Sequence, residues 1–294
     1  MTAVKEKAYA KINLYLDVIG IREDGFHDIE TVMHSVSLYD EITVSVIPAR
    51  SYSVRMQIDC TDYLPTDSKN LAVKAANLFC SRLGIKDEIL IKIKKNIPIA
   101  AGLAGGSSDA AAVLRALNKI YKRPFTKSSL AALSAELGSD VPYCVFGKTA
   151  LCEGRGEKVT RILTEPKLNV VIACANEHIS TPEAYRMLDD KYERFSGNIF
   201  TGGEGRLDSL VSSLSKQDSV DTERVFNIFE SVILPICDGA RDIKNILIDH
   251  GALCAIMSGS GPSVFAIFKT KCEAEKATKT LIEKKYRAWS TTSV

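Results

Sequence analysis

Alternation of hydrophobic and polar residues marks the first strong element of the chain, between residues 8 and 18. The apolar positions are Ala10, Ile12, Leu14, Leu16 and Val18, and the polar positions between them are Tyr9, Lys11, Asn13, Tyr15 and Asp17. A period of two residues predicts a β-strand with one apolar face. Lys11 and Asn13 would lie side by side on the polar face. There they could address one ligand or, as the alternative, face solvent at a sheet edge.

The hydrophobic pattern predicts further strands and helices along the rest of the chain. Apolar or alternating runs predict strands at residues 40–46, 52–58, 89–93, 169–173, 252–257 and 263–268, and a last strand after residue 285. Spacings of three and four predict helices at residues 70–83, 128–137, 225–232, 240–249 and 272–285, and a helix start at 180–185. Residues 195–206 hold four glycines and show no period, so we assign them no role.

A glycine-rich loop, residues 98–108 with the sequence PIAAGLAGGSS, joins the strand at 89–93 to a further helix. Its glycines allow a sharp bend and close approach of a ligand, and Ser107 and Ser108 are suitable N-cap residues for the helix. Free N–H groups and the positive dipole end at a helix start favour anions. The loop therefore predicts a phosphate site, with a plain turn that packs a helix against a strand as the alternative.

Better-known phosphate motifs do not account for this loop. The P-loop pattern fails because Pro142 stands where the first glycine before Gly147-Lys148-Thr149 belongs, and the dinucleotide pattern fails both after Gly102 and after Gly154. A second glycine-rich turn, SGSGP at residues 258–262, lies between two apolar strands. It could close over phosphates or form an ordinary hairpin.

Two other segments carry candidate chemistry. Asp24 and Gly25 predict a turn that places Phe26 and His27 just beyond the bend. An aromatic ring and an imidazole suit a nucleobase, with a core phenylalanine and a surface histidine as the alternative. Asp140 lies between a helix end and an apolar run. We therefore expect a half-buried carboxylate that has a partner or a task, unless it only forms a local Asx turn.

Composition narrows the class of protein. At about 150 residues per domain the 294 residues suggest two domains, and with 38 basic and 36 acidic residues the net charge is only +2. Such a net charge provides no electrostatic field strong enough to recruit nucleic acid or an anionic membrane.

The eight cysteines never stand at C-x-x-C spacing, which argues against a zinc site and for reduced thiols. With no signal peptide and no run of 18 apolar residues, we expect a soluble cytoplasmic protein of unspecified oligomeric state.

The order of these segments closely resembles the GHMP kinase superfamily, from Ala8 to about Phe268. The segments that carry the resemblance are KINLYLDV, DGFHDIETVMHSVSLYD, PIAAGLAGGSSDAAAVLRALN, LGSDVPYCV and MSGSGPSVFAIF. The glycine loop is specific to the superfamily. The D-G-[FY]-H segment separates mevalonate, homoserine and galactose kinases from the branch that phosphorylates 4-diphosphocytidyl-2-C-methyl-D-erythritol.

The resemblance implies an α+β fold of two lobes. The N-terminal lobe would resemble the second domain of a small-subunit ribosomal protein, and the C-terminal lobe would be ferredoxin-like. We expect residues 1–160 to form the ATP-binding domain and residues 161–294 to complete the substrate site. The implied reaction is ATP-dependent phosphorylation of the substrate's 2-hydroxyl in the non-mevalonate route to isoprenoid precursors. The alternatives are another GHMP kinase, of the mevalonate or homoserine type, and a nucleotide-binding regulator without turnover.

The resemblance also implies roles for individual residues in ATP binding and phosphoryl transfer. The residues that match the ATP loop are Pro98, Ile99, Ala100, Ala101, Gly102, Leu103, Ala104, Gly105, Gly106, Ser107 and Ser108. Asn70 matches a residue that helps to hold the adenine end. Lys11 and Asp140 match the catalytic pair, in which the aspartate is the base and the lysine orients the hydroxyl and offsets charge. Mg²⁺ is expected on the ATP phosphates, near Ser108, and its protein ligands are left open.

Substrate recognition is implied for five residues. Phe26 and Tyr185 match the aromatic pair that sandwiches the cytosine, and His27 matches the residue that reads the base edge. Asn13 and Thr181 match further substrate contacts. Tyrosine is usual in the family at the position of Phe26, so the resemblance leaves a hydroxyl hydrogen bond in doubt but retains the stacking ring.

Overall fold

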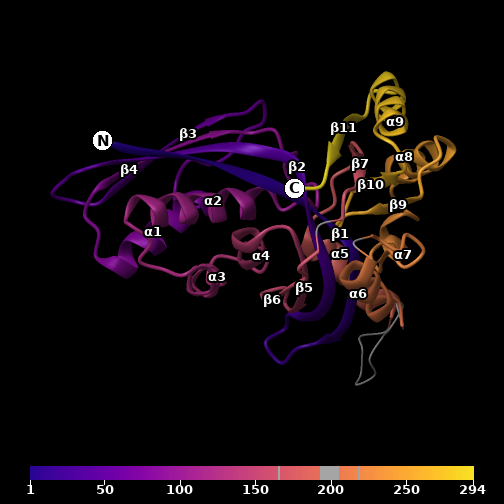
Figure 1. The fold of residues 1–294 in the computed structure, drawn as a ribbon, viewed down its shortest axis with the longest axis horizontal. Coiled ribbons are helices and arrows are strands. Elements are labelled where there is room, and N and C mark those ends of the chain that lie inside the picture. The colour runs from indigo at the N-terminus through magenta and orange to yellow at the C-terminus, as the bar shows by residue number, and fades with distance from the viewer. Residues whose placement is uncertain (165, 193–204, 218) are drawn as a thin grey trace. The chain divides into compact units, whose positions relative to one another are not determined.

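The computed structural model describes residues 1–164, 166–192, 205–217 and 219–294, and it mixes helices with strands (Figure 1). Most of the glycine-containing segment 195–206 lies outside the described residues. Two compact units divide the chain. The first consists of Met1–Ala10, Leu38–Ile99 and Ala104–Gly147, and the second of Lys11–Ser37, Ala100–Leu103 and Lys148–Val294. The long strands β1 (Thr2–Ile21) and β2 (His27–Ile47) contribute residues to both units.

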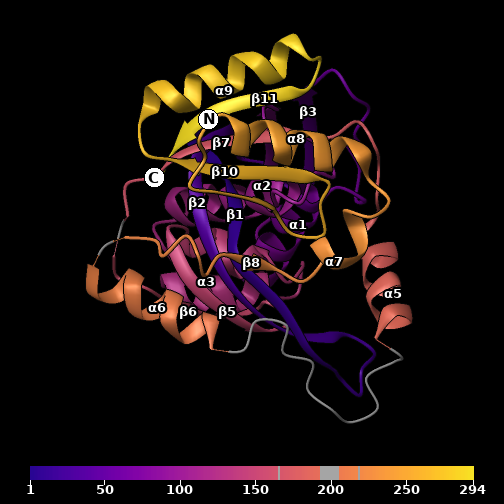
Figure 2. The ribbon, with the colours of Figure 1, turned by 90° about the vertical axis from the view of Figure 1, so that its right-hand side faces the viewer.

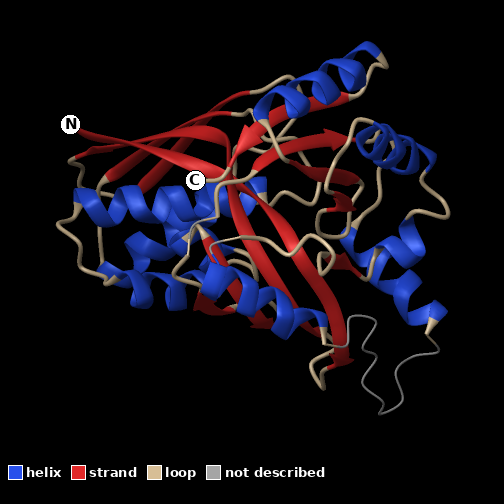
Figure 3. Ribbon diagram, turned by 45° about the vertical axis from the view of Figure 1, so that its right-hand side comes forward, coloured by secondary structure: helices blue, strands red, loops and turns tan. Residues whose placement is uncertain are grey.

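In the first unit, strands lie beside a layer of helices. Strand β4 (Glu88–Lys94) pairs antiparallel with β2 and parallel with β3 (Ser53–Asp59). Helix α1 (Leu71–Leu83) packs against α2 (Gly105–Ile120), and α4 (Val141–Phe146) packs against both α2 and α3 (Lys127–Ser134). Figure 3 shows these helices in blue beside the red strands. The predicted strands and α1 are confirmed, whereas α3 is shorter than the helix predicted at residues 128–137.

Helix α2 begins earlier than its sequence suggests. Ala104 is the N-cap residue with a φ of 55°, and no side chain caps this end, so the predicted N-cap role of Ser107 and Ser108 is wrong. The first intrahelical bond runs from Ser108 N to Ala104 O at 2.9 Å, which leaves the N–H groups of residues 105–107 without an acceptor in the helix. Because Ala104 adopts the left-handed conformation, the loop ends there and α2 begins at Gly105. Ser107 and Ser108 therefore lie in the first turn of the helix.

The second unit contains a four-stranded antiparallel sheet with the strand order β11-β7-β10-β9. Its strands and the two helices packed on them occur in the order β7 (Asn169–Cys174), α8 (Asp238–Asp249), β9 (Cys254–Met257), β10 (Ser263–Phe268), α9 (Lys271–Glu283) and β11 (Arg287–Thr292), with other elements between β7 and α8. This βαββαβ order is ferredoxin-like, as predicted. Figure 1 shows α8 and α9 on one side of the sheet, where Ala240, Ile243, Ala274 and Leu281 join its apolar core.

Shorter elements complete the second unit. Strand β5 (Thr149–Gly154) pairs with β2 and with β6 (Lys158–Arg161), and β8 (Phe226–Asn227) runs parallel to β1 (Figure 2). Three helices join them, α5 (Thr181–Lys191), α6 (Arg206–Gln217) and α7 (Glu230–Ile233). The helix predicted at residues 225–232 is therefore wrong over its first part, which is strand β8 and a turn.

Strand β1 confirms the predicted alternation of apolar and polar residues, but it excludes one of the two roles considered for the polar face. The apolar residues from Ala10 to Val18 are 0–4% exposed, as expected for a core-facing row. The polar row is buried as well, with Lys11 4% exposed and Asn13 2% exposed. The solvated-edge alternative is therefore wrong for these two residues. Buried polar side chains need hydrogen-bond partners, and those partners define the candidate site.

Candidate active site

The Lys11 ammonium is held by two oxygens of the second unit. Its Nζ donates to Asn13 Oδ1 at 2.7 Å and to the Gly102 carbonyl at 2.8 Å. Two of the three donors of an ammonium are thereby directed by the protein. Because Gly102 belongs to the glycine loop, the strand predicted to carry the cation and the loop predicted to hold phosphate meet at this bond.

Asn13 is the central acceptor of this group. Its Oδ1 also accepts a hydrogen bond from Gly259 N at 2.9 Å, and its Nδ2 donates to Thr31 Oγ1 at 2.8 Å. The Thr31 hydroxyl in turn donates to Tyr15 O at 2.6 Å. Since the hydroxyl proton goes to a carbonyl, Thr31 Oγ1 can only accept from Asn13. The amide orientation of Asn13 is thus fixed, with its oxygen toward Lys11.

The turn at residues 258–262 contacts the glycine loop directly. Ser258 Oγ donates to Gly102 O at 3.0 Å. Gly102 has a φ of +71°, and a Cβ atom there would lie 2.1 Å from the Ser258 carbonyl oxygen. Gly102 is therefore required both for its backbone conformation and for this close approach. The turn joins β9 to β10 as a hairpin, which was one of its two predicted roles.

A buried ion cluster lies behind the start of α2 in the first unit. Lys95 Nζ donates to Asp40 Oδ2 at 2.5 Å and to Asp109 Oδ2 at 2.8 Å, and the three side chains are at most 7% exposed. Burial raises the pKa of the Asp109 carboxyl well above its ordinary range, and Asp40 raises it further while Lys95 opposes the shift. Asp40 Oδ1 also accepts from Ile97 N at 2.8 Å. The cluster therefore ties the chain entering the loop to the helix leaving it.

Asn70 is the N-cap residue of α1. Its Oδ1 accepts from Ala72 N at 2.9 Å and its Nδ2 donates to Pro65 O at 2.9 Å. These bonds give Asn70 a structural role at this helix start. An adenine contact remains a prediction.

Asp140 immediately precedes the six-residue helix α4 in the first unit. Its side chain makes no hydrogen bond that caps this helix. Its carbonyl accepts from Cys144 N at 3.0 Å, which fixes the backbone at this position. Asp140 and Lys11 belong to different compact units, and their pairing as catalytic base and cation remains a prediction.

Two of the three predicted base-reading residues, His27 and Tyr185, lie together in the second unit. The rings of His27 and Tyr185 lie 4.5 Å apart between centroids with an interplanar angle of 30°, and Phe229 packs edge-on against Tyr185. His27 Nε2 is 2.8 Å from Asp189 Oδ1. Tyr185 and Asp189 stand four positions apart on α5, so both project from one face of that helix. This spacing was the sequence signal by which Asp189 could have been found.

Phe26 is 52% exposed and lies in the turn between β1 and β2. The guanidinium carbon of Arg155 is 4.8 Å from the centroid of its ring. The predicted stacking ring is thus available to a ligand at the surface. Its pairing with Tyr185 across a base remains a prediction.

Thr181, the first residue of α5, also reaches the glycine turn. Its Oγ1 is 3.0 Å from Ser260 Oγ, and Ser180 caps the helix start through a bond from Glu183 N. The turn at 258–262 therefore touches residues predicted to bind substrate as well as the predicted catalytic lysine. Sequence reasoning singled out this turn but did not anticipate Asn227, which braces it from inside the mispredicted helix.

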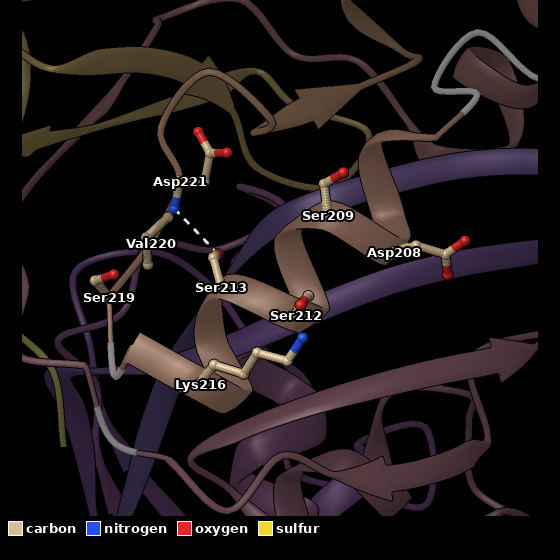
Figure 4. A pocket seen from close by; sticks show the side chains of 8 residues that line it. All are labelled: Asp208, Ser209, Ser212, Ser213, Lys216, Ser219, Val220 and Asp221. Carbon is tan, nitrogen blue, oxygen red and sulfur yellow. Dashed lines mark hydrogen bonds between the residues drawn. The ribbon is translucent and has the colours of Figure 1, made fainter.

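A separate surface pocket of about 590 Å³ lies along α6 (Figure 4). Its lining consists of serines, charged residues and Val220, from α6 and the segment 219–221, with Ser213 Oγ accepting from Asp221 N at 3.4 Å. None of the predicted site residues lines this pocket.

Neither a cluster of metal-binding side chains nor a membrane-spanning helix occurs in the part of the chain that the structure describes. In the ranges that the structure describes, no group of three His, Cys, Asp or Glu side chains is arranged to hold a metal ion. Within the same ranges, no helix is long and apolar enough to cross a membrane.

Comparisons with known proteins agree with this geometry. Residues 70–148 match the model for the GHMP kinases N terminal domain, and residues 209–288 match the model for GHMP kinases C terminal. A 4-diphosphocytidyl-2-C-methyl-D-erythritol kinase from Caldicellulosiruptor saccharolyticus is 43% identical over 92% of this chain and 90% of its own. One of the same name from Clostridium kluyveri is 43% identical over 92% of both chains.

Solved structures support the same family. A crystal structure of 4-(cytidine 5'-diphospho)-2C-methyl-D-erythritol kinase superposes with a TM-score of 0.81 at 28% identity, covering 99% of this chain and all of the other. A homoserine kinase from Cytophaga hutchinsonii gives a TM-score of 0.77 at 20% identity, over 100% of this chain and 95% of its own, and shows the fold alone. The predicted two-lobed α+β kinase fold is confirmed. The chain therefore belongs to the 4-diphosphocytidyl-2-C-methyl-D-erythritol kinase family of the GHMP kinases.

Proposed function

We propose that the protein transfers the γ-phosphoryl group of ATP to the 2-hydroxyl of 4-diphosphocytidyl-2-C-methyl-D-erythritol, a step in the non-mevalonate route to isoprenoid precursors. The relatives at 40–43% identity carry the name of this kinase. The observation that carries the proposal is the bond from Lys11 Nζ to the Gly102 carbonyl, since it places a buried cation on the glycine loop.

Phosphoryl transfer asks a protein mainly for positioning and charge stabilisation. The glycine loop, residues 98–108, supplies backbone donors for phosphates, because the N–H groups of residues 105–107 have no acceptor within α2. Lys11 supplies a cation whose direction is set by two oxygens. Asp140 is the base that takes the proton of the substrate hydroxyl, and Asn70 holds the adenine end.

Cytosine recognition falls to the cluster in the second unit. Phe26 and Tyr185 stack on the base, and His27 reads its edge, while Asn13 and Thr181 contact the rest of the substrate. Asp189 accepts from His27 Nε2, so Nδ1 is the ring nitrogen that faces the edge of the cytosine. In this proposal, residues 1–160 bind ATP and residues 161–294 complete the substrate site.

ATP would bring Mg²⁺, which neutralises charge on the phosphates. The donor set of the described residues fits an ion held mainly by phosphate oxygens and water. Ser108, the residue that the resemblance places near this ion, is 2% exposed and donates its hydroxyl proton to Gly105 O at 2.9 Å. The hydroxyl oxygen of Ser108 keeps its lone pairs, and it is the protein oxygen that we assign to the neighbourhood of the metal. We further propose that the protein acts in the cytoplasm, in keeping with its free cysteines.

An acceptor panel tests the proposed reaction. Purified protein is incubated with Mg-ATP and, in parallel, with the cytidine-linked methylerythritol, free methylerythritol, mevalonate and homoserine. Phosphate transfer to the cytidine-linked acceptor alone is expected. Phosphorylation of mevalonate or homoserine instead would replace the proposal with another kinase of the superfamily, and ATP binding without transfer to any acceptor would favour a regulator.

Asp140→Asn tests the assigned base. The variant should lose about 10²- to 10⁴-fold in kcat with little change in the KM for ATP, since general-base catalysis contributes on that order. Circular dichroism serves as the control for folding. A variant that keeps its kcat would remove Asp140 from the mechanism.

A further inference from the structure

Asn227 is a buried polar residue outside every segment that sequence motifs single out. It is 2% exposed and lies in the two-residue strand β8. Its Nδ2 donates to Met257 O at 2.9 Å and to Gly259 O at 2.8 Å, and its Oδ1 accepts from Phe229 N at 3.0 Å. Both donors of the side-chain amide and its acceptor are therefore satisfied, and the amide orientation is determined.

These bonds hold one residue of the glycine turn from both sides. Gly259 O accepts from Asn227, while Gly259 N donates to Asn13 Oδ1 at 2.9 Å. Gly259 has a φ of +59°, and a Cβ atom there would lie 3.1 Å from Gly102 O and 3.3 Å from Lys11 Nζ. The turn thus approaches the lysine and the glycine loop so closely that a shift of the turn must change their bonds.

Both oxygens that direct Lys11 depend on this turn. Asn13 Oδ1 shares its lone pairs between Lys11 Nζ and Gly259 N, and Gly102 O shares its lone pairs between Lys11 Nζ and Ser258 Oγ. A displaced turn would remove one hydrogen bond from each of these acceptors, the bond from Gly259 N to Asn13 Oδ1 and the bond from Ser258 Oγ to Gly102 O, and would let both oxygens shift relative to the ammonium. Misplacement of a positioning group by about 1 Å can cost on the order of 10²-fold in rate.

We infer that Asn227 is a positioning residue for phosphoryl transfer, which holds the 258–262 turn so that Asn13 and the Gly102 carbonyl fix the direction of the Lys11 ammonium. The inference rests on the proposed function, since it takes Lys11 as the cation of the reaction. Asn227 acts indirectly, because its amide bonds only to backbone groups of Met257, Gly259 and Phe229 in the hydrogen bonds described above. Its effect must therefore pass through Lys11, and this condition separates positioning from a general contribution to folding.

Asn227→Ala tests the inference against a matched control. Asn118→Ala is suitable because Asn118 is a buried asparagine of α2 that also bridges backbone, donating to Phe125 O at 2.9 Å and accepting from Phe125 N at 3.1 Å. Asn227→Ala should lower kcat about 10- to 100-fold with the KM for ATP within about twofold. Asn118→Ala should lower the melting temperature while its kcat stays within about twofold of wild type.

A double-mutant cycle supplies the decisive readout. In a Lys11→Ala background, where the residual rate is followed by radiolabelled product, Asn227→Ala should cause no further loss of kcat, because effects transmitted through one residue are not additive. An equal loss in both backgrounds, or an unchanged kcat in the wild-type background, would overturn the inference. The wild-type acceptor panel is run first, so failure of the proposed function is recognised separately as absence of turnover.

Ser258→Ala covers the case in which Asn227→Ala does not fold. This variant removes only the hydroxyl, which lies 3.0 Å from Gly102 O and 3.5 Å from Asn13 Oδ1, the two oxygens that direct Lys11. It should lower kcat about 10-fold, and that loss should vanish in the Lys11→Ala background. Retention of full kcat, or the same loss in both backgrounds, would contradict the link between the turn and the lysine.

Discussion

His34 should make the stability of the protein fall as the pH is lowered from about 6.5 to about 4. The side chain is 1% exposed, and burial lowers the pKa of His34 from its ordinary value of 6.5 to about 4. The folded protein therefore keeps the ring neutral in this window, whereas the unfolded chain protonates it. Because the unfolded state binds more protons, the free energy of unfolding rises with pH here and is lost toward acid.

The hydrogen bonds of His34 define which proton it carries. Ser293 Oγ donates to Pro166 O at 2.6 Å, so it can only accept from His34 Nε2, 2.9 Å away. His34 Nδ1 then accepts from Thr149 Oγ1 at 2.9 Å. The neutral Nε2–H tautomer is satisfied at both nitrogens, and a second proton on Nδ1 would face the buried hydroxyl of Thr149.

The expected loss of unfolding free energy follows from the pKa shift of His34. A difference of about 2.5 pKa units corresponds to about 3 kcal/mol, lost at up to about 1.4 kcal/mol per pH unit. Urea denaturation is followed at pH 7.5, 6, 5 and 4 by the fluorescence of the single tryptophan, Trp289, which lies in β11. The quantity of interest is the difference in unfolding free energy between the wild type and His34→Gln at each pH.

That difference should shrink by about 3 kcal/mol between pH 7.5 and 4, since titration of all other groups is common to both proteins. His178→Gln is the control, because His178 is exposed and its loss should leave the pH dependence unchanged. Parallel curves for the wild type and His34→Gln would refute the assignment of a buried neutral imidazole.

Three further predictions concern the loop, the base site and the ion cluster. Gly102→Ala should cost at least about 1–2 kcal/mol from its left-handed backbone alone, with an added clash at Ser258. Denaturation should show no such loss for Gly106→Ala, whose Cβ would lie 3.6 Å from Leu71 Cδ1. His27→Ala should raise the KM for the cytidine-linked acceptor about 10-fold or more while the KM for ATP stays nearly constant, and equal changes in both would exclude base reading. Lys95→Met should lower the free energy of unfolding by about 3–5 kcal/mol, since it leaves two buried carboxylates unpaired, and a loss below about 1 kcal/mol would contradict the importance of this cluster.

Local patterns were sufficient to predict most elements of the fold. The alternation in β1 and the capping residues Asn70 and Gly84 of α1 act within a few residues of themselves, so the sequence displays them directly. The helix predicted at residues 225–232 was wrong over its first part because Asn227 bonds to Met257 and Gly259, thirty or more positions later. Such tertiary bonds override local helix propensity and leave no periodic signal.

The candidate site was predictable in its residue types but less so in its connections. Lys11 and Asn13 were identified as neighbours on one strand face, yet their burial depends on carbonyl and amide groups of Gly102 and Gly259. Backbone carbonyl and amide groups occur in nearly every residue, so the spacing of residue types could not reveal these contacts. Asp189 was in principle visible at helical spacing from Tyr185, whereas its bond to His27 depends on the turn before β2.

The bond between Gly259 N and Asn13 Oδ1 joins residues 246 positions apart. During synthesis the lysine-bearing strand leaves the ribosome well before the turn that orders its amine has been translated. Because such distant contacts form late in folding, a nascent chain would carry the glycine loop long before it could align its cation. Turnover would begin only after the turn at residues 258–262 has been made.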